Sequence, residues 1–279
     1  MFKHKYFFLF LLSATVILCG CKPATDQNKQ PEIAVANSYL RCVVKDVCGY
    51  QMEVMSLVPP GMCPGHFDIS PSQVNQLGGC SVLLLFDFQH KIGDSLSRLK
   101  ERGLKIRTVE CPEGLCLPET YLTIARSVAD ALSKDNPAKR TEYYNRLELI
   151  KNQFDDLSAG IHKKMEQSEL IGTKVVTSGH QAVFADWLGL DVVATFAGSD
   201  TETPTSINQC LRQAKDKAVR FVIANKQEGT ELATALAERL NADMVVFSNF
   251  PSGRSDNDST PGFNLLLLEN ISSLLNAGG

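Results

Sequence analysis

Short apolar runs alternate along the first third of the chain with segments whose apolar residues recur every three or four positions. The run Ser81–Phe86 (SVLLLF) is apolar without a break, which is typical of a strand buried inside a parallel sheet. Strands that alternate with helices predict a parallel sheet covered by helices on both faces. The predicted strands are Ile33–Ala36, Met52–Val58, Ser81–Phe86 and Lys105–Glu110, and the predicted helices are Tyr39–Val47, Pro71–Leu77 and Ile92–Glu101.

The middle of the chain is predicted to be helical. Glu119–Leu132 keeps apolar residues at spacings of three and four, and Asp135-Asn136-Pro137 interrupts the pattern. Thr141–Glu169 then continues without a proline and with one glycine, far beyond the usual length of a helix. Such a helix would be roughly 40 Å long, which is enough to cross a whole domain.

After this helix the alternation of strands and helices begins again. The sequence therefore predicts an α/β fold of two lobes, each a parallel sheet flanked by helices, joined by one long connector helix. We place the N-terminal lobe at 32–133, the connector at 134–169 and the C-terminal lobe at 170–279. The predicted strands of the second lobe are Lys174–Ser178, Val192–Phe196, Val219–Ala224 and Met244–Ser248, and its helices are Phe184–Leu188, Thr205–Lys217, Gly229–Leu240 and Gly262–Asn276.

The N-terminus has the pattern of an export signal. Lys3 and Lys5 precede the apolar run Tyr6–Leu18, which is short for a membrane span and has the length of a signal-peptide core. The following Leu18-Cys19-Gly20-Cys21 resembles a bacterial lipoprotein signal, in which Cys21 would carry the lipid. We therefore expect a signal peptide over 1–20 and a polar tether over 21–31, with a single transmembrane anchor as the alternative. Either way the folded part would lie outside the cytoplasm, in the periplasm or at the cell surface, attached to a membrane.

Composition narrows the class of protein. The chain has 279 residues, of which 44% are hydrophobic and 21% charged, and its net charge is −3. It is long enough for one large domain or two lobes, and no basic stripe suggests a nucleic-acid partner. Seven cysteines follow Cys21. Because cysteines of exported proteins usually pair, an odd number leaves at least one that is free, buried or itself a ligand. Cys42 and Cys48 are close enough to pair, and for Cys111 and Cys116 we expect a disulfide rather than a role as ligands.

Residues able to bind metal follow several of the predicted strands. Met52–Val58 ends in a proline-glycine turn that holds Cys63, His66 and Asp68 within six residues. The strand Lys174–Ser178 is followed directly by Gly179 and His180. Imidazole, thiolate and carboxylate groups on loops at the ends of parallel strands are typical of a ligand-binding rim. A histidine that caps a helix and a cysteine with a structural role are the plainer alternatives, and Asp68 is more suited to orienting a histidine than to binding metal.

Several segments resemble one known family. The best match is Val176-Thr177-Ser178-Gly179-His180-Gln181-Ala182 with Phe184 and Gly189-Leu190. The other matching segments are Met52–Pro60 with Gly61, His66-Phe67-Asp68 with Pro71-Ser72, Leu117-Pro118-Glu119, Asp135–Pro137 with the long helix, and Phe247-Ser248-Asn249. From about Ile33 to the C-terminus, these segments are similar to the substrate-binding lipoproteins of metal-ion ABC importers, the ZnuA/TroA-like periplasmic solute-binding family.

The resemblance implies four protein ligands, two from each lobe, around a buried ion. In this chain they would be His66, Glu113, His180 and Asn249, with Cys63 as a possible additional ligand. His180 falls directly on a ligand position of the family. Glu113 stands about where the family has a second histidine, His66 is one position late, and Asn249 replaces the usual aspartate.

Two nitrogen and two oxygen ligands suit zinc, with manganese or iron(II) as alternative cargo. The resemblance implies an extracytoplasmic binding protein that hands a divalent ion to an ABC permease and its ATPase, acts as a monomer and has no catalytic residue. The same fold could instead bind a chelated metal or a small organic ligand, or act as a metal-binding surface adhesin. Neither HExxH nor a nucleophile on a strand-to-helix elbow is present, which argues against an enzyme. Because the long helix resists bending, we expect limited closure around the cargo.

Overall fold

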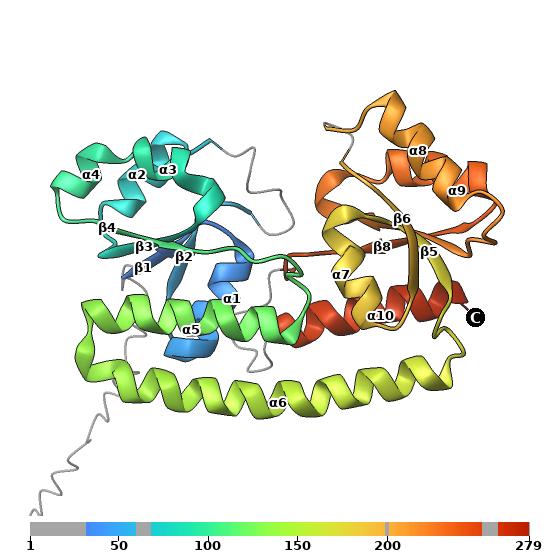
Figure 1. Ribbon diagram of the computed structural model, residues 1–279. Coiled ribbons are helices and arrows are strands. Elements are labelled where there is room, and N and C mark those ends of the chain that lie inside the picture. The colour runs from blue at the N-terminus through green and yellow to red at the C-terminus, as the bar shows by residue number, and fades with distance from the viewer. Residues whose placement is uncertain (1–31, 60–67, 199–200, 253–261, 279) are drawn as a thin grey trace, which may run out of the picture.

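The computed structural model describes residues 32–59, 68–198, 201–252 and 262–278. Two four-stranded parallel sheets lie side by side above a layer of long helices (Figure 1). The described elements agree with two α/β lobes joined by a connector helix, as the sequence predicts. The structure gives no helix, within these ranges, that is long and apolar enough to cross a membrane.

The N-terminal lobe has its strands in the order β2-β1-β3-β4. Every neighbouring pair is parallel. Its strands are β1 (Ile33–Val35), β2 (Val54–Ser56), β3 (Val82–Phe86) and β4 (Lys105–Val109), and its helices are α1 (Ser38–Cys48), α2 (Pro71–Leu77), η2 (Asp87–Gln89), α3 (His90–Asp94), α4 (Ser97–Glu101) and α5 (Pro118–Asp135).

The C-terminal lobe repeats this arrangement with the order β6-β5-β7-β8, again with all pairs parallel. In both lobes the first and third strands in sequence are therefore neighbours at the centre of the sheet. Its strands are β5 (Lys174–Ser178), β6 (Asp191–Phe196), β7 (Phe221–Asn225) and β8 (Asp243–Phe247), and its helices are α7 (Gly179–Trp187), α8 (Pro204–Ala214), η4 (Lys226–Glu228), α9 (Glu231–Leu240) and α10 (Gly262–Gly278).

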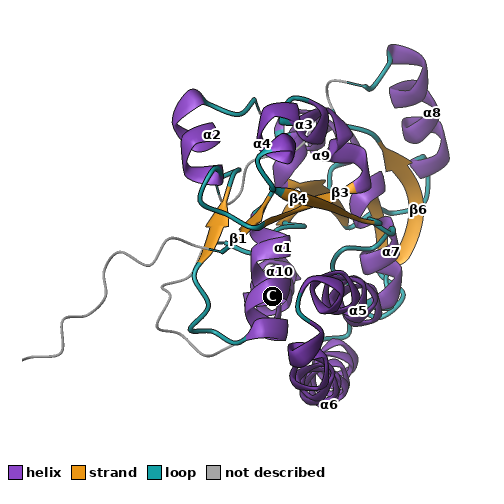
Figure 2. Ribbon diagram, turned by 90° about the vertical axis from the view of Figure 1, so that its left-hand side faces the viewer, coloured by secondary structure: helices purple, strands orange, loops and turns teal. Residues whose placement is uncertain are grey.

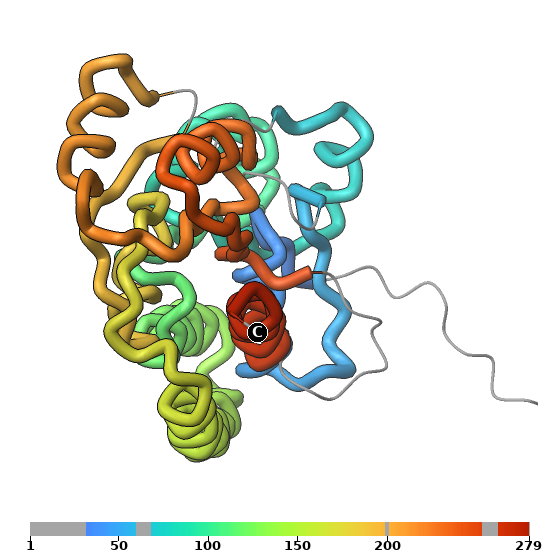
Figure 3. Tube along the Cα trace, turned by 90° about the vertical axis from the view of Figure 1, so that its right-hand side faces the viewer, coloured from blue at the N-terminus to red at the C-terminus, as the bar shows by residue number. Residues whose placement is uncertain are grey.

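The connector consists of a short turn, η3 (Pro137–Lys139), and the 28-residue helix α6 (Arg140–Gln167). A helix of this length is about 42 Å long, so it runs beneath both lobes (Figure 1). Figures 2 and 3 look along the molecule from opposite ends and show α6 and α10 nearly end-on below the sheets. The predicted limits 141–169 differ from the observed ones by one or two residues.

The predicted helix Ile92–Glu101 forms two shorter helices instead. Ser95 Oγ donates a hydrogen bond to the carbonyl of Ile92 at 2.7 Å, and α3 ends at Asp94. Serine side chains that bond to nearby carbonyls compete with the regular helical ladder. Apolar spacing alone could not reveal this break, because Ile92, Leu96 and Leu99 still face one core.

One hydrophobic core extends through both lobes and the helical layer. Separate, smaller clusters cover the outer faces of the two sheets beneath the shorter helices. The centre of the shared core is an aromatic cluster in which the Phe263 ring lies 4.3 Å from Tyr121 and 5.1 Å from Phe154, centroid to centroid. Because Tyr121 belongs to the first lobe, Phe154 to the connector and Phe263 to α10, this cluster joins all three parts of the molecule.

A buried carboxylate lies beside this aromatic cluster. Asp46 on α1 is 2% exposed and accepts hydrogen bonds from the hydroxyls of Tyr121 at 2.5 Å and Tyr50 at 2.9 Å. The side chain of Arg146 on α6 donates to the Asp46 backbone carbonyl at 2.8 Å. Burial raises the pKa of the Asp46 carboxyl from 3.8 to about 6, although both tyrosines and Arg146 favour its charged form.

Candidate functional site

His180 lies at the carboxyl end of β5, where the chain passes directly into α7. Ser178 forms the N-cap of this helix, and its hydroxyl accepts a hydrogen bond from the backbone N–H of His180 at 3.3 Å. A serine at this position satisfies one of the free donors of the first helical turn. The His180 side chain is 69% exposed, so its ring stands at the rim of the sheet and is open to solvent.

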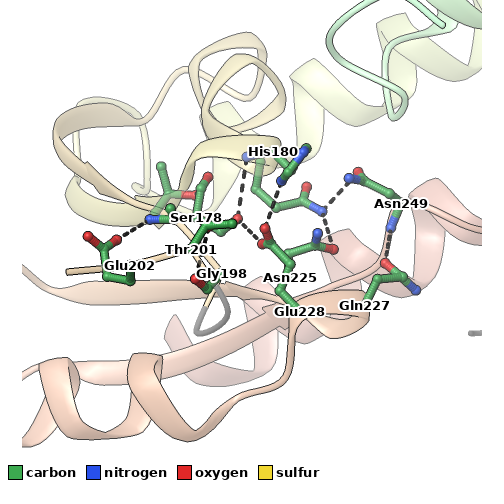
Figure 4. Close-up of polar contacts among 12 residues, drawn as sticks. Ser178, His180, Gly198, Thr201, Glu202, Asn225, Gln227, Glu228 and Asn249 are labelled. Carbon is green, nitrogen blue, oxygen red and sulfur yellow. Dashed lines mark hydrogen bonds and ion pairs between the residues drawn. The ribbon is translucent and has the colours of Figure 1, made fainter. Parts of the chain in front are cut away.

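Glu228 is the direct partner of His180. Its Oε1 lies 2.8 Å from His180 Nδ1, and its Oε2 accepts a hydrogen bond from the Ser178 hydroxyl at 2.5 Å (Figure 4). Glu228 ends the short helix η4, which follows β7, and β7 is the strand beside β5. The two side chains therefore meet at the central pair of strands, although 48 positions separate them in sequence.

The electrostatics of this pair favour the charged forms of both groups. The hydrogen bond to Glu228 raises the pKa of the His180 imidazole above 6.5, burial opposes the shift, and the charge of Glu113 adds to it. Burial acts against ionisation of Glu228, but the hydrogen bonds from His180 and Ser178 outweigh it and hold its pKa below 4.5. Glu228 is consequently a carboxylate at neutral pH.

Glu113 approaches the same rim from the other lobe. It is exposed on the loop between β4 and α5, and its backbone carbonyl accepts a hydrogen bond from the Thr120 hydroxyl at 3.1 Å. The next residue, Gly114, packs so closely on α7 that an added Cβ would lie 3.3 Å from Val183 Cγ1. Val183 is one helical turn beyond His180, so the loop brings two of the predicted ligands together across the lobes.

Asn249 is buried rather than open to the rim. Its Oδ1 accepts hydrogen bonds from Gln181 Nε2 at 2.9 Å and from the Cys116 thiol at 3.4 Å. Its backbone N–H donates to Gln227 Oε1 at 2.9 Å, which fixes the loop after β8 against the loop after β7 (Figure 4). Only 4% of Asn249 is exposed, and its amide oxygen is occupied by neutral donors from both lobes.

The predicted disulfide between Cys111 and Cys116 is not present. Both are free thiols in the structure, as are Cys42 and Cys48. The Cys116 thiol turns into the junction between the lobes, where it donates to the carbonyl of Ser248 at 3.1 Å. Burial raises the pKa of the Cys111 thiol to about 12 and raises that of Cys116 as well, so neither is a thiolate ready to bind metal.

Three predicted functional residues lie outside the described residues, namely Cys21, Cys63 and His66. Among the residues that are described, no group of three or more histidine, cysteine, aspartate or glutamate side chains is placed to hold a metal ion. The four-ligand site thus remains a prediction. The structure brings His180 and Glu113 to one rim and places Asn249 in the buried network below it.

Sequence reasoning missed Glu228 and the amide network of Gln181, Asn225 and Gln227. Gln181 Nε2 contacts Asn225 Oδ1 at 3.4 Å as well as Asn249, and Gln227 Nε2 donates to the Ser248 hydroxyl at 3.0 Å. The available signal was position in the sequence, because Asn225 ends the third strand of the lobe and Glu228 follows three residues later. Ligands in open α/β sheets bind where the central strands end and the strand order reverses.

Two lobes of equal strand order, a long connector and a histidine at the carboxyl edge of a central strand define the class of two-lobed α/β solute-binding proteins. Residues 33–277 match the family described as ZnuA, zinc-uptake complex component A, periplasmic. The chain belongs to this family, which supplies a substrate-binding component for metal uptake and not an enzyme.

Similar proteins agree with this assignment. The zinc-binding protein TroA of Treponema pallidum (strain Nichols) is 23% identical over 180 residues, and the match spans 58% of this chain and 58% of that protein. A crystal structure of ZnuA is 16% identical, with a TM-score of 0.71 over 90% of this chain and 100% of that one. A manganese-bound periplasmic metal-binding protein from Candidatus Liberibacter asiaticus is 14% identical, with a TM-score of 0.71 over 88% of this chain and 99% of that one.

Proposed function

We propose that this chain captures a divalent metal ion between its two lobes and delivers it to an ABC permease driven by its ATPase. The observation that supports this most is His180, held at the carboxyl rim of the second lobe with the Glu113 loop of the first lobe packed on the same helix. Family membership supports the same function, since the family is a component of zinc uptake.

In the proposed site His66, Glu113 and His180 supply two imidazoles and one carboxylate, and Asn249 supplies a neutral oxygen. Such a set suits zinc in tetrahedral coordination, and manganese or iron(II) are the alternative cargo. For Asn249 to join the ion, its amide oxygen must exchange the hydrogen bonds from Gln181 and Cys116 for the metal. Cys63 remains a proposed additional ligand.

We also propose that lipid on Cys21 anchors the protein to a membrane, with the folded part in the periplasm or at the cell surface and monomeric. Closure around the ion is limited to the loops, because the aromatic cluster and α6 belong to a core shared by both lobes. Solution scattering with and without metal tests this part of the proposal. A change in the radius of gyration as large as that of a hinge closure would contradict it.

The experiment begins with elemental analysis of the purified protein, followed by zinc and manganese titration of the stripped protein. We expect about one tightly held zinc per chain. His180→Ala should weaken binding at least about tenfold, because it removes an imidazole ligand from the site. His90→Ala is the matched control, since His90 is exposed at the start of α3.

Two results would contradict the proposal. Equal affinities of the His180→Ala and His90→Ala variants would mean that the site is misplaced. No metal bound at micromolar concentration would favour a chelated metal or a small organic ligand at the same rim. The neutral Asn249 side chain, whose amide oxygen already accepts two hydrogen bonds, also supports that candidate.

A further inference from the structure

We propose that Glu228 is the positioning residue of this site: it holds the His180 ring with Nδ1 protonated, so that the lone pair of Nε2 is free to bind the cargo ion. This inference rests on the proposed function. It assigns a role to a carboxylate that does not belong to the predicted ligand set.

The direction of the hydrogen bond follows from the chemistry of the two groups. An ionised carboxylate can only accept, so the 2.8 Å contact between His180 Nδ1 and Glu228 Oε1 requires the proton on Nδ1. In neutral imidazole the other nitrogen then carries an unshared pair. Once the ring is neutral, Nε2 is therefore the nitrogen of His180 that can bind metal, on a side chain that is mostly exposed.

Glu228 is itself held in place on several sides. Ser178, which is fully buried, donates its hydroxyl hydrogen to Glu228 Oε2 at 2.5 Å, and the Asn225 side chain is a further hydrogen-bonding partner of the carboxylate. Gly198 closes the remaining side, because an added Cβ would lie 3.0 Å from Glu228 Oε1 and 3.3 Å from Glu228 Cβ. A carboxylate fixed in this way can fix the ring that it contacts.

The same contacts explain why Glu228 acts through His180 rather than as a ligand. Both of its oxygens accept short hydrogen bonds, and only 17% of its side chain is exposed. A carboxylate that accepts from the far nitrogen of a metal-binding histidine fixes the ring orientation and makes it a stronger donor to the metal. Loss of such a partner typically weakens metal affinity 10–100-fold.

The first test needs no metal. Nitrogen-15 NMR of the stripped, full-length protein in detergent reports which ring nitrogen of His180 carries the proton, at an alkaline pH where the imidazole is neutral. The His180→Ala spectrum identifies the signals. We expect the Nδ1–H form in the wild type and a shift towards the Nε2–H form in Glu228→Ala. A wild-type ring protonated on Nε2 would overturn the proposal.

The second test measures zinc affinity by competition with a chelating dye in a double-mutant cycle. We expect Glu228→Ala to weaken zinc binding 10–100-fold when His180 is present, and less than about twofold in the His180→Ala background. Glu228→Gln should lie between wild type and Glu228→Ala, because its amide oxygen still accepts from Nδ1–H. Equal losses in both backgrounds would show a merely structural role and would overturn the proposal.

Glu202→Gln is the matched control for loss of a carboxylate in the same lobe. Glu202 accepts hydrogen bonds from the backbone N–H groups of Ala197 and Thr203 and is not a partner of His180. The zinc affinity of the Glu202→Gln variant should equal that of the wild type. If the wild type binds no zinc, the proposed function fails, whereas the NMR result still decides whether Glu228 sets the tautomer of His180.

Discussion

Asp46 makes the stability of the fold depend on pH in a way that one substitution should remove. Its carboxyl is buried beside Tyr121 and Tyr50, and its pKa is raised from 3.8 to about 6. The native state therefore binds more protons at this group than the unfolded chain does between these two values. Since protonation favours the state with the higher pKa, this group costs stability as pH rises from about 4 to about 7.

The size of the effect follows from the shift of about two pKa units. At about 1.4 kcal/mol per unit, the charged carboxylate costs the native state ~3 kcal/mol above pH 7, and nothing below pH 4. Asp46→Asn cannot ionise, and its amide can still hydrogen-bond the two tyrosine hydroxyls. The stability of the variant relative to wild type should therefore rise by ~3 kcal/mol between about pH 4 and about pH 7.

The assay is urea unfolding of metal-free wild type and variant at several pH values, followed by circular dichroism and extrapolated to water. Other groups that titrate in this range contribute equally to both proteins and cancel in the difference. A difference in the free energy of unfolding that stays constant across the range would refute the reasoning, because it would show that Asp46 does not change its charge within the native state.

Two further predictions concern how the lobes are joined. Phe263→Ala should lower stability by about 3–5 kcal/mol in urea unfolding, because it empties the centre of the aromatic cluster, whereas Phe88→Ala, with 46% of its side chain exposed, should cost far less. Equal costs would mean that the cluster is not a packed core. Gly114→Ala should weaken zinc binding, since Gly114 has φ +73° and an added Cβ would lie 3.3 Å from Val183 Cγ1 on α7, which strains the Glu113 loop and moves it off α7. Gly103→Ala, with φ +104° and open space around it, should cost about 1–2 kcal/mol of stability and leave zinc affinity unchanged, and a fall in zinc affinity equal to that of Gly114→Ala would contradict this account.

The sequence predicted the architecture well because each element has a local signal. Short apolar runs identified the strands, and a long stretch with no proline and one glycine identified the connector. His180 was predicted for a similar reason, since it comes two residues after a strand, within the segment that best matches the family. The break at Ser95 was missed because it depends on one side-chain hydrogen bond that leaves the apolar spacing unchanged.

The rest of the site depends on which strands are neighbours, and local patterns do not contain that information. Glu228 meets His180 only because β7 pairs with β5 in the sheet. The predicted Cys111–Cys116 disulfide relied on closeness in sequence, but the Cys116 thiol donates a hydrogen bond to the carbonyl of Ser248, 132 positions away. Asn249 stays a predicted ligand, and its burial by Gln181 and Cys116 was not foreseen because it depends on contacts between the lobes.

The core that passes through both lobes has a consequence for how the proposed cargo leaves. If the frame does not swing open, as proposed above, the ion has no wide exit and would depart as water replaces its ligands one after another. Residence time is then set by the coordination bonds and not by a domain motion. On this proposal the membrane permease would itself loosen the rim loops around His180 and Glu113, and the free carrier would keep its ion until it docks.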